Sequence, residues 1–177
     1  MRCVKWLKTL SFNNMTTFHK VVKLPALKKK LALLHRQGRT IAFTNGCFDI
    51  LHYGHVSYLE AAKKKDRVLI VGMNSDVSVQ GLKGPSRPIV PQDQRAAVLA
   101  GLMCVDFVVL FNEPTPYELI KALKPDILIK GADWKGKEVA GSDVVKASGG
   151  RVEFITYIER LSTTNIVDKI RQQCVGQ

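Results

Sequence analysis

Two histidines three positions apart are the residues in this chain most suited to chemistry. His52 and His55 lie in the run TNGCFDILHYGH (residues 44–55), where an apolar stretch ends and a helical pattern begins. Side chains at positions i and i+3 share one face of a helix, so both imidazoles can point to one spot. Gly54 between them has no side chain and lets a ligand come close. Imidazole N–H donors beside the positive end of a helix suit phosphate oxygens.

The two histidines also have other interpretations. They could be ordinary half-buried residues at a helix start, although the paired spacing and the glycine argue against this. A zinc site would need a third and a fourth ligand, and Cys47 is the only nearby thiol. Its C-x4-H-x2-H spacing matches no closed structural zinc site. An anion site is therefore the preferred hypothesis.

A second group of polar residues follows a later apolar run. Residues 131–138 (GADWKGKE) mimic a phosphate-binding P-loop, but Glu138 stands where that loop needs a Ser or Thr hydroxyl. A P-loop is therefore rejected. Lys130 and Asp133 remain candidates for polar contacts at a strand end, with a solvated turn as the alternative.

Three consecutive hydroxyl residues precede the last helical pattern. Ser162 or Thr163 is the natural N-cap, because short hydroxyl side chains accept hydrogen bonds from the first helical N–H groups. Together with Thr164, they would also suit a polyphosphate beside the positive helix end.

Residues 80–95 form a basic segment that contains glycine and three prolines. We expect this segment to be a stiff loop that holds an anionic substrate. Lys83 would act as a point charge and Arg95 as a two-pronged phosphate ligand. A solvated basic loop is the alternative.

The elements that position these residues follow from alternating hydrophobic patterns. Near-continuous apolar runs are typical of strands covered by helices on both faces. Their alternation with helical patterns predicts an α/β fold, a doubly wound parallel sheet in a single domain. In such sheets ligands lie at the carboxyl ends of the strands. The expected helices are 24–37, 55–65, 93–103, 115–124, 142–150 and 163–173, and the expected strands are 40–46, 67–74, 105–111, 126–131 and 151–158.

Composition limits the functional classes. The 177 residues are 46% apolar, and 27 basic against 15 acidic residues give a net charge of +12. Ten basic residues and no acidic one precede Asp49, so the remaining chain is nearly neutral with 17 basic and 15 acidic residues. We expect residues 1–20 to be a basic extension and residues 21–177 to be the domain. The extension is either dispensable or results from a start codon placed upstream of the true start at Met15. Scattered cysteines and no run of about 18 apolar residues indicate a cytoplasmic protein without a membrane span.

Taken together, the motifs resemble those of the cytidylyltransferase-like nucleotidyltransferases. The resemblance covers about residues 20–172 and is greatest to the adenylyltransferase domain of ADP-heptose synthases. Its motifs are FTNGCFDILHYGH, VGMNSDVSV, LKGPSRPI, VDFVVLFNEPTP, IKGADW and LSTTNIV.

The resemblance implies a Rossmann-like nucleotidyltransferase fold and the transfer of AMP from ATP to D-glycero-β-D-manno-heptose 1-phosphate. The products would be pyrophosphate and ADP-heptose, which is used for the lipopolysaccharide core. Mg²⁺ would be bound through the nucleotide phosphates, with no metal ligands from the protein. A separate heptose kinase and a homodimer are implied, and neither nucleic acid nor a membrane is an expected partner.

The family's functional residues can be carried over where the motifs match. His52 and His55 match the H-x-G-H pair, residues 162–164 match the S-T-T motif on the triphosphate, and Lys83 matches a lysine that contacts the acceptor. The expected catalytic residues are therefore His52, His55 and Lys83. The expected nucleotide ligands are Cys47, Phe48, Gly54, Gly131, Asp133, Ser162, Thr163 and Thr164. The expected substrate ligands are Asp49, Lys83 and Arg95.

Two alternatives remain open at this point. A cytidylyltransferase acting on glycerol 3-phosphate or a similar polyol phosphate would share the motifs, but its R-T-E-G-I-S-T-T stretch is YIERLSTT here, with Arg160 in place of the glycine. The heptose branch has K-G-G-D where Ala132 gives K-G-A-D. A nucleic-acid-binding module that uses the basic extension is the other alternative, and the basic stretch lacks interleaved aromatic residues.

Overall fold

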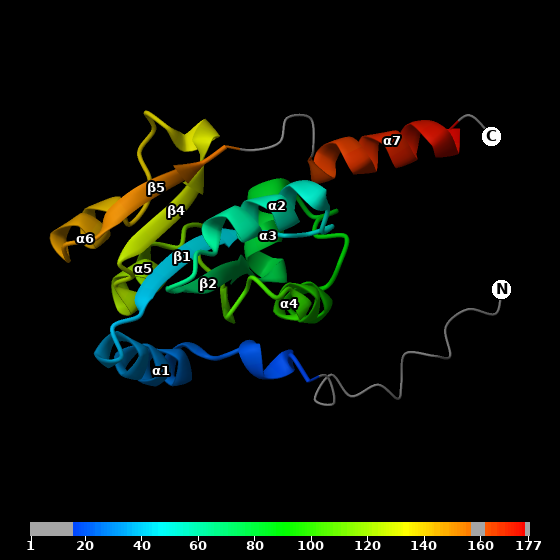
Figure 1. Cartoon of the computed structure of the whole chain (residues 1–177). Helices are drawn as coiled ribbons and strands as arrows, with labels where there is room; N and C mark the ends of the chain where they lie inside the picture. Colours follow the sequence, from blue (N-terminus) through cyan, green and yellow to red (C-terminus); the bar gives the residue numbers. More distant parts are fainter. Residues whose placement is uncertain (1–15, 157–161, 176–177) are drawn as a thin grey trace.

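The chain folds around a five-stranded parallel sheet. The structure, a computed structural model, describes residues 16–156 and 162–175. Its strand order is β3-β2-β1-β4-β5, and all neighbouring pairs are parallel (Figure 1). This arrangement confirms the predicted doubly wound sheet. The strands are β1 (Thr40–Gly46), β2 (Arg67–Asn74), β3 (Phe107–Phe111), β4 (Ile127–Gly131) and β5 (Arg151–Ile155).

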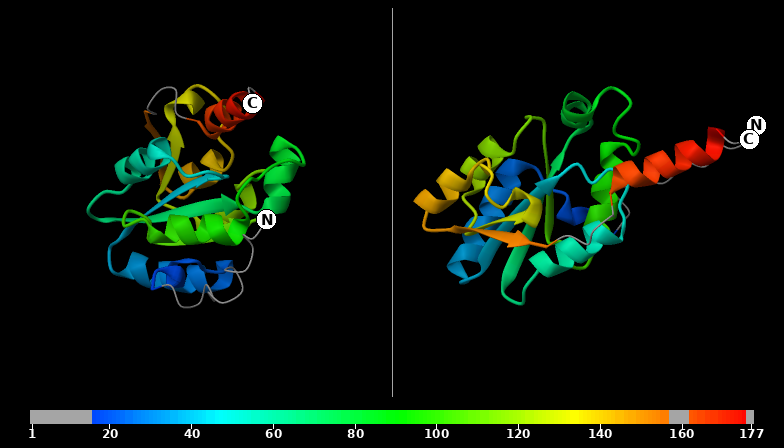
Figure 2. Two further views of the ribbon diagram at one scale, coloured as in Figure 1. Left: turned by 90° about the vertical axis from the view of Figure 1, so that its right-hand side faces the viewer. Right: turned by 90° about the horizontal axis from the view of Figure 1, so that it is seen from above.

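Helices cover both faces of the sheet (Figure 2). One core cluster joins α2 and α4 to β1–β4, and the other joins α1, α5 and α6 to the opposite face. No described helix is long and apolar enough to cross a membrane. The helices are η2 (Phe18–Lys20), α1 (Leu24–Arg36), α2 (Tyr53–Ala62), α3 (Asp76–Lys83), α4 (Gln92–Gly101), α5 (Tyr117–Leu123), η3 (Ala132–Trp134), α6 (Ser142–Ala147) and α7 (Thr163–Val175).

Helix α3 corrects the prediction of a single loop over residues 80–95. Residues 80–83 end α3, and residues 92–95 begin α4, so the loop covers only 84–91. The Ser75 side chain caps α3 by accepting a hydrogen bond from the Ser78 N–H, and Val79 is fully buried beneath the helix. Capping and burial outweigh the poor helix propensity of two valines and a glycine in this segment.

The expected N-terminal extension is partly built into the fold. Its residues 1–15 lie outside the described residues, whereas Lys20 of η2 donates a hydrogen bond from Nζ to the Leu102 carbonyl oxygen at 3.0 Å. The Val22 N–H donates to the Val108 carbonyl oxygen at 2.9 Å. Residues 21 and 22, which directly follow the expected extension, therefore lie along the outer edge of β3, which would otherwise expose unpaired backbone groups.

The close contact between β1 and β2 gives a stability prediction. A Cβ atom at Gly72 would lie 2.6 Å from Cζ of the buried Phe43 ring. We expect Gly72→Ala to lower the free energy of unfolding by about 1–3 kcal/mol because the core is overpacked. Gly81→Ala is the control, since a Cβ atom there meets nothing within 4 Å. Urea unfolding measures both, and wild-type stability of the Gly72 variant would contradict the packing argument.

Candidate functional site

Two adjoining cavities lie at the carboxyl ends of the strands. The smaller has a volume of about 120 Å³ and the larger about 340 Å³. Asn45, Gly46, Cys47 and Tyr58 line both, so the two cavities form one cleft. The smaller cavity is also lined by Phe48, Asp49, His55, Lys83 and Thr163. The larger one is also lined by Asn74, Leu82, Pro114, Thr115, Pro116, Lys130, Gly131, Trp134 and Ala140.

The two histidines are brought together at the start of α2. His52 is the N-cap residue, and its carbonyl oxygen accepts a hydrogen bond from the His55 N–H at 2.9 Å. The imidazole rings stack with centroids 3.9 Å apart, and the Phe48 ring lies 5.2 Å from the His55 ring. The two imidazoles therefore lie together at the N-terminus of α2.

Burial favours the neutral form of both imidazoles. Burial lowers the pKa of His55 to about 4, with smaller contributions from the charges of His52 and Lys83. Burial also lowers the pKa of His52. Each ring has a buried Nδ1 without a hydrogen-bond partner among the described residues. A phosphate bound against the pair would raise both pKa values, because an anion stabilises the protonated ring.

Phe48 adopts an uncommon backbone conformation beside the cavity. Its φ angle is +46°, and its side chain is buried against the His55 ring. A non-glycine residue in this left-handed region is costly and persists only when the surroundings hold it. No local sequence signal indicates this turn, which directs the chain from β1 towards His52.

The hydroxyl motif stands at the N-terminus of α7. Ser162 is the N-cap, since its Oγ accepts a hydrogen bond from the Asn165 N–H at 3.1 Å. Thr163 is buried, lines the smaller cavity and donates a hydrogen bond to the Ile50 carbonyl oxygen at 3.4 Å. Thr164 is exposed and lines neither cavity. Arg160 lies outside the described residues.

The remaining expected ligands are distributed around the cleft. Lys83 is the last residue of α3, and its exposed side chain lines the smaller cavity. Gly131 ends β4 beside the larger cavity, and Gly54 is buried in the first turn of α2. Asp133 is exposed on η3 and lines neither cavity.

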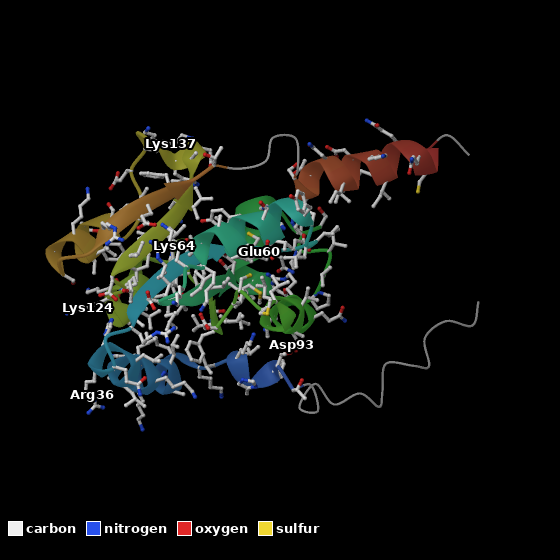
Figure 3. All side chains as sticks on the ribbon, in the orientation of Figure 1. Arg36, Glu60, Lys64, Asp93, Lys124 and Lys137 are labelled. Atoms are coloured by element: carbon white, nitrogen blue, oxygen red, sulfur yellow. The ribbon has the colours of Figure 1, made fainter. Side chains whose placement is uncertain are left out.

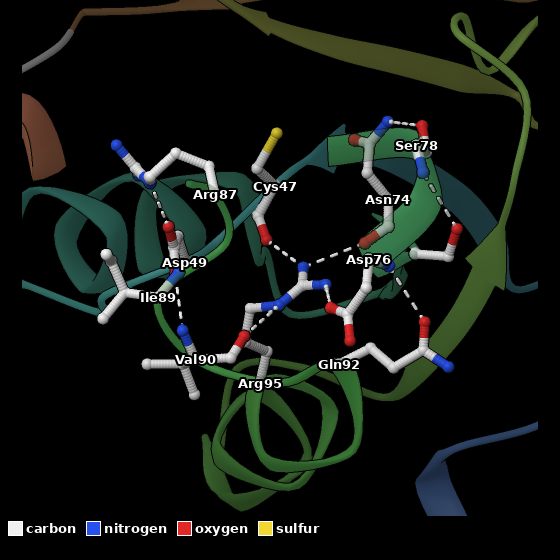
Figure 4. Close-up of polar contacts among 11 residues, drawn as sticks. Cys47, Asp49, Asn74, Asp76, Ser78, Arg87, Ile89, Val90, Gln92 and Arg95 are labelled. Carbon is white, nitrogen blue, oxygen red and sulfur yellow. Dashed lines mark hydrogen bonds and ion pairs between the residues drawn. The ribbon is translucent and has the colours of Figure 1, made fainter. Parts of the chain in front are cut away.

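Arg95 is not available to a substrate, so the expectation of a phosphate ligand there is wrong (Figure 4). It is only 2% exposed. Its Nε donates to the Val90 carbonyl oxygen at 2.9 Å, and its Nη1 donates to the carbonyl oxygens of Cys47 and Asn74. Its Nη2 pairs with Asp76 at 2.7 Å. All three nitrogens are therefore used within the protein.

Asp49 is likewise a structural residue and not the expected substrate ligand. Its Oδ1 accepts hydrogen bonds from the N–H groups of Ile89 and Val90 at 2.8 and 2.9 Å, and its Oδ2 pairs with Arg87 at 2.6 Å. Burial raises the pKa of Asp49, but these hydrogen bonds outweigh burial and leave the pKa below its ordinary value. Asp49 therefore holds the loop of residues 84–91 against the start of α2.

Several cleft residues were not singled out from the sequence. Asn45 and Tyr58 line both cavities, and Trp134 lines the larger one. Tyr58 follows His55 by three positions on α2, and its hydroxyl shares a 2.8 Å hydrogen bond with the Thr44 hydroxyl. The i, i+3 spacing could have indicated Tyr58, whereas Asn45 and Trp134 carry no distinctive local pattern.

The lowered pKa of Asp49 gives a pH-dependent prediction. We expect Asp49→Asn to lower the free energy of unfolding at pH 7 by roughly 1–3 kcal/mol, because charge-assisted hydrogen bonds are lost. The contribution is fully present above the unfolded pKa of about 3.9 and is lost as the pH falls through the lower folded value. The difference between wild type and variant should therefore shrink in acid.

Denaturant unfolding between pH 2 and pH 7 measures this difference. Asp66→Asn is the control, because Asp66 is exposed. A constant difference between wild type and Asp49→Asn across this range would contradict the assigned charge state.

The chain matches a known protein family and several curated proteins. The cytidylyltransferase-like family matches residues 43–169. The bifunctional protein HldE of Nitratiruptor sp. is 60% identical over 138 residues, which cover 78% of this chain and 29% of that protein. HldE of Campylobacter jejuni is 50% identical over 168 residues, covering 93% and 36%. The chain spans about a third of the length of these curated relatives.

A solved structure has a related fold. The lipopolysaccharide core biosynthesis protein from Thermoplasma volcanium matches with a TM-score of 0.54 and 28% identity, over 67% of this chain and 96% of that one. The family match extends from β1 into α7 and includes the histidine pair and Thr163. By this match, the chain belongs to the cytidylyltransferase-like family.

Proposed function

We propose that the protein transfers AMP from ATP to D-glycero-β-D-manno-heptose 1-phosphate and forms ADP-heptose and pyrophosphate. The observation that carries this proposal is the single small cavity that joins His55, Lys83 and Thr163 at the N-termini of α2 and α7. The similarity to HldE proteins favours ATP and a heptose acceptor within the family. The reaction would take place in the cytoplasm and requires a kinase that phosphorylates the sugar.

The chemistry needs little from the protein beyond placement and charge. The acceptor phosphate is ionised at neutral pH, so one of its oxygens attacks the α-phosphorus of ATP directly. The bond between the α-phosphorus and the bridging oxygen breaks, and pyrophosphate leaves with that oxygen. Catalysis therefore consists of alignment and stabilisation of the transferring group, as in other phosphoryl-type transfers.

The histidines, Thr163 and Lys83 have distinct tasks in this scheme. The neutral imidazoles of His52 and His55 donate hydrogen bonds to the α-phosphate and the bridging oxygen. The N-terminus of α7 and the Thr163 hydroxyl bind the β- and γ-phosphates. Lys83 neutralises charge on the acceptor side of the cavity.

Mg²⁺ would enter with the nucleotide. No group of three or more His, Cys, Asp or Glu residues among residues 16–156 and 162–175 could hold a metal ion. Mg²⁺ commonly keeps several water ligands and binds through substrate phosphates. When bound, it would supply positive charge to the triphosphate.

The substrate pair is tested by magnesium-dependent pyrophosphate release. ATP and CTP are each combined with the heptose 1-phosphate and with glycerol 3-phosphate. We expect release only with ATP and the heptose 1-phosphate. Release only with CTP would overturn the proposal in favour of a polyol-phosphate cytidylyltransferase.

The histidine role is tested by His55→Ala. We expect kcat to fall by about 10²–10³, because one donor to the developing charge is removed. His35→Ala is the control, since His35 lies on α1 and bonds to Asp126. Equal melting temperatures would show that both variants fold, and full turnover by the His55 variant would contradict the assignment.

A further inference from the structure

Lys130 is a buried cation at the larger cavity. It lies on β4, next to its last residue, and is 7% exposed. Its Nζ donates a hydrogen bond to Oδ1 of Asn45 at 2.5 Å and lies 5.0 Å from the centre of the Trp134 ring. Within the described part of the chain, no carboxylate oxygen lies within 4.0 Å of Nζ.

Three shielded arginines of the fold each pair with a carboxylate, unlike Lys130. Arg67 pairs with Glu153 at 2.7 Å, Arg87 with Asp49 at 2.6 Å and Arg95 with Asp76 at 2.7 Å. Burying a charge without a counter-charge is costly, so such groups are normally paired. Lys130 departs from this rule at a position that faces a cavity, where a ligand can supply the missing charge.

The lowered pKa of Lys130 is what burial without a carboxylate in contact would produce. Burial lowers its pKa to about 8, and the nearby charge of Asp133 only partly opposes this effect. An ammonium group has three N–H donors, and among the described residues its one hydrogen-bond acceptor is the neutral amide oxygen of Asn45. Trp134 offers the face of its ring and no counter-charge. An anionic ligand group would satisfy the remaining donors and restore the charge balance.

The position of Lys130 indicates which substrate it would meet. His55 and Thr163 mark the smaller cavity as the place of the triphosphate, whereas the larger cavity extends towards α3 and the loop after β3 through Leu82 and Thr115. Asn45 lines both cavities. A phosphate held between Lys130 and Asn45 would therefore lie where the two cavities meet, beside the nucleotide.

We propose that Lys130, held in place by Asn45, binds the phosphate group of the acceptor in the larger cavity. This inference rests on the proposed nucleotidyl transfer and adds a specificity-determining residue to it. The ammonium selects phosphorylated acceptors, because a neutral hydroxyl compound cannot balance the buried charge. Lys83 would then complement Lys130 from the side of the smaller cavity.

The first test is the effect of Lys130→Met on substrate affinity. Loss of a charge-assisted hydrogen bond should raise the KM for the heptose 1-phosphate about 10- to 100-fold. The KM for ATP should change less than about threefold, which separates acceptor binding from a general disturbance of the cleft. Lys137→Met is the matched control, because Lys137 lies on the outer surface (Figure 3). An equal rise in both KM values, or an unchanged acceptor KM, would overturn the inference.

A pH profile provides a readout that a purely structural role would not change. The wild-type acceptor KM should rise above about pH 8, where Lys130 loses its proton. Lys130→Arg should remove this rise, since arginine stays charged, and Lys130→Met should show a high KM throughout. Asp133 is the charged group that acts on Lys130 among the described residues, so Asp133→Asn should shift the rise to lower pH.

A binding measurement separates this inference from the proposed reaction. Inorganic phosphate is titrated calorimetrically into protein saturated with Mg²⁺ and α,β-methylene ATP, whose α–β bridge resists cleavage. We expect binding to wild type and Lys137→Met, and at least tenfold weaker binding to Lys130→Met. If wild type binds phosphate in this way but does not use the heptose 1-phosphate, the proposed acceptor is wrong and the phosphate site stands. Equal binding by wild type and Lys130→Met, or none by wild type, would refute the site.

Discussion

The cleft depends on one buried guanidinium. Arg95 projects from α4 and bonds to the carbonyl oxygens of Cys47 after β1 and Asn74 at the end of β2 (Figure 4). It also holds Asp76 at the start of α3 and the Val90 carbonyl oxygen in the following loop. The ends of β1 and β2 are neighbours in the sheet, whereas α3 and the loop after it lie beyond the strands, so Arg95 connects the sheet to both. Because desolvated acceptors are costly without donors, the positions of the cleft walls follow from this guanidinium.

The distribution of charge separates the scaffold from the binding surface. The shielded arginines form ion pairs with carboxylates. Asp49 also holds the loop after α3 through two backbone N–H groups and Arg87. The ammonium groups of Lys83 and Lys130 line the cavities and form no ion pair with any described carboxylate. Positive charge is therefore neutralised where it supports the fold and left available where an anion would bind.

Local patterns predicted the sheet well and the cleft only in part. The bounds of β1 and β2 agree with the apolar runs, and the Ser162 cap agrees with its hydroxyl motif, because these signals depend on neighbouring residues alone. Arg95 and Asp49 were misassigned as ligands, since a charged residue has the same sequence signature whether a substrate or the protein satisfies it. The left-handed Phe48 and helix α3 depend on tertiary contacts, which spacing does not reveal.

The lowered pKa values of the histidines and of Lys130 have the same main cause, which is burial. Burial lowers the pKa of His55 to about 4 and that of Lys130 to about 8, because each group lies in a desolvated wall and forms no ion pair with a described carboxylate. Phosphates would reverse both effects, since an anion stabilises the protonated form of each group. The cleft would then be least favourable electrostatically when empty and most favourable when both phosphorylated substrates are present. Binding is then most favourable when both substrates are present. In this state the two substrates must be aligned for transfer.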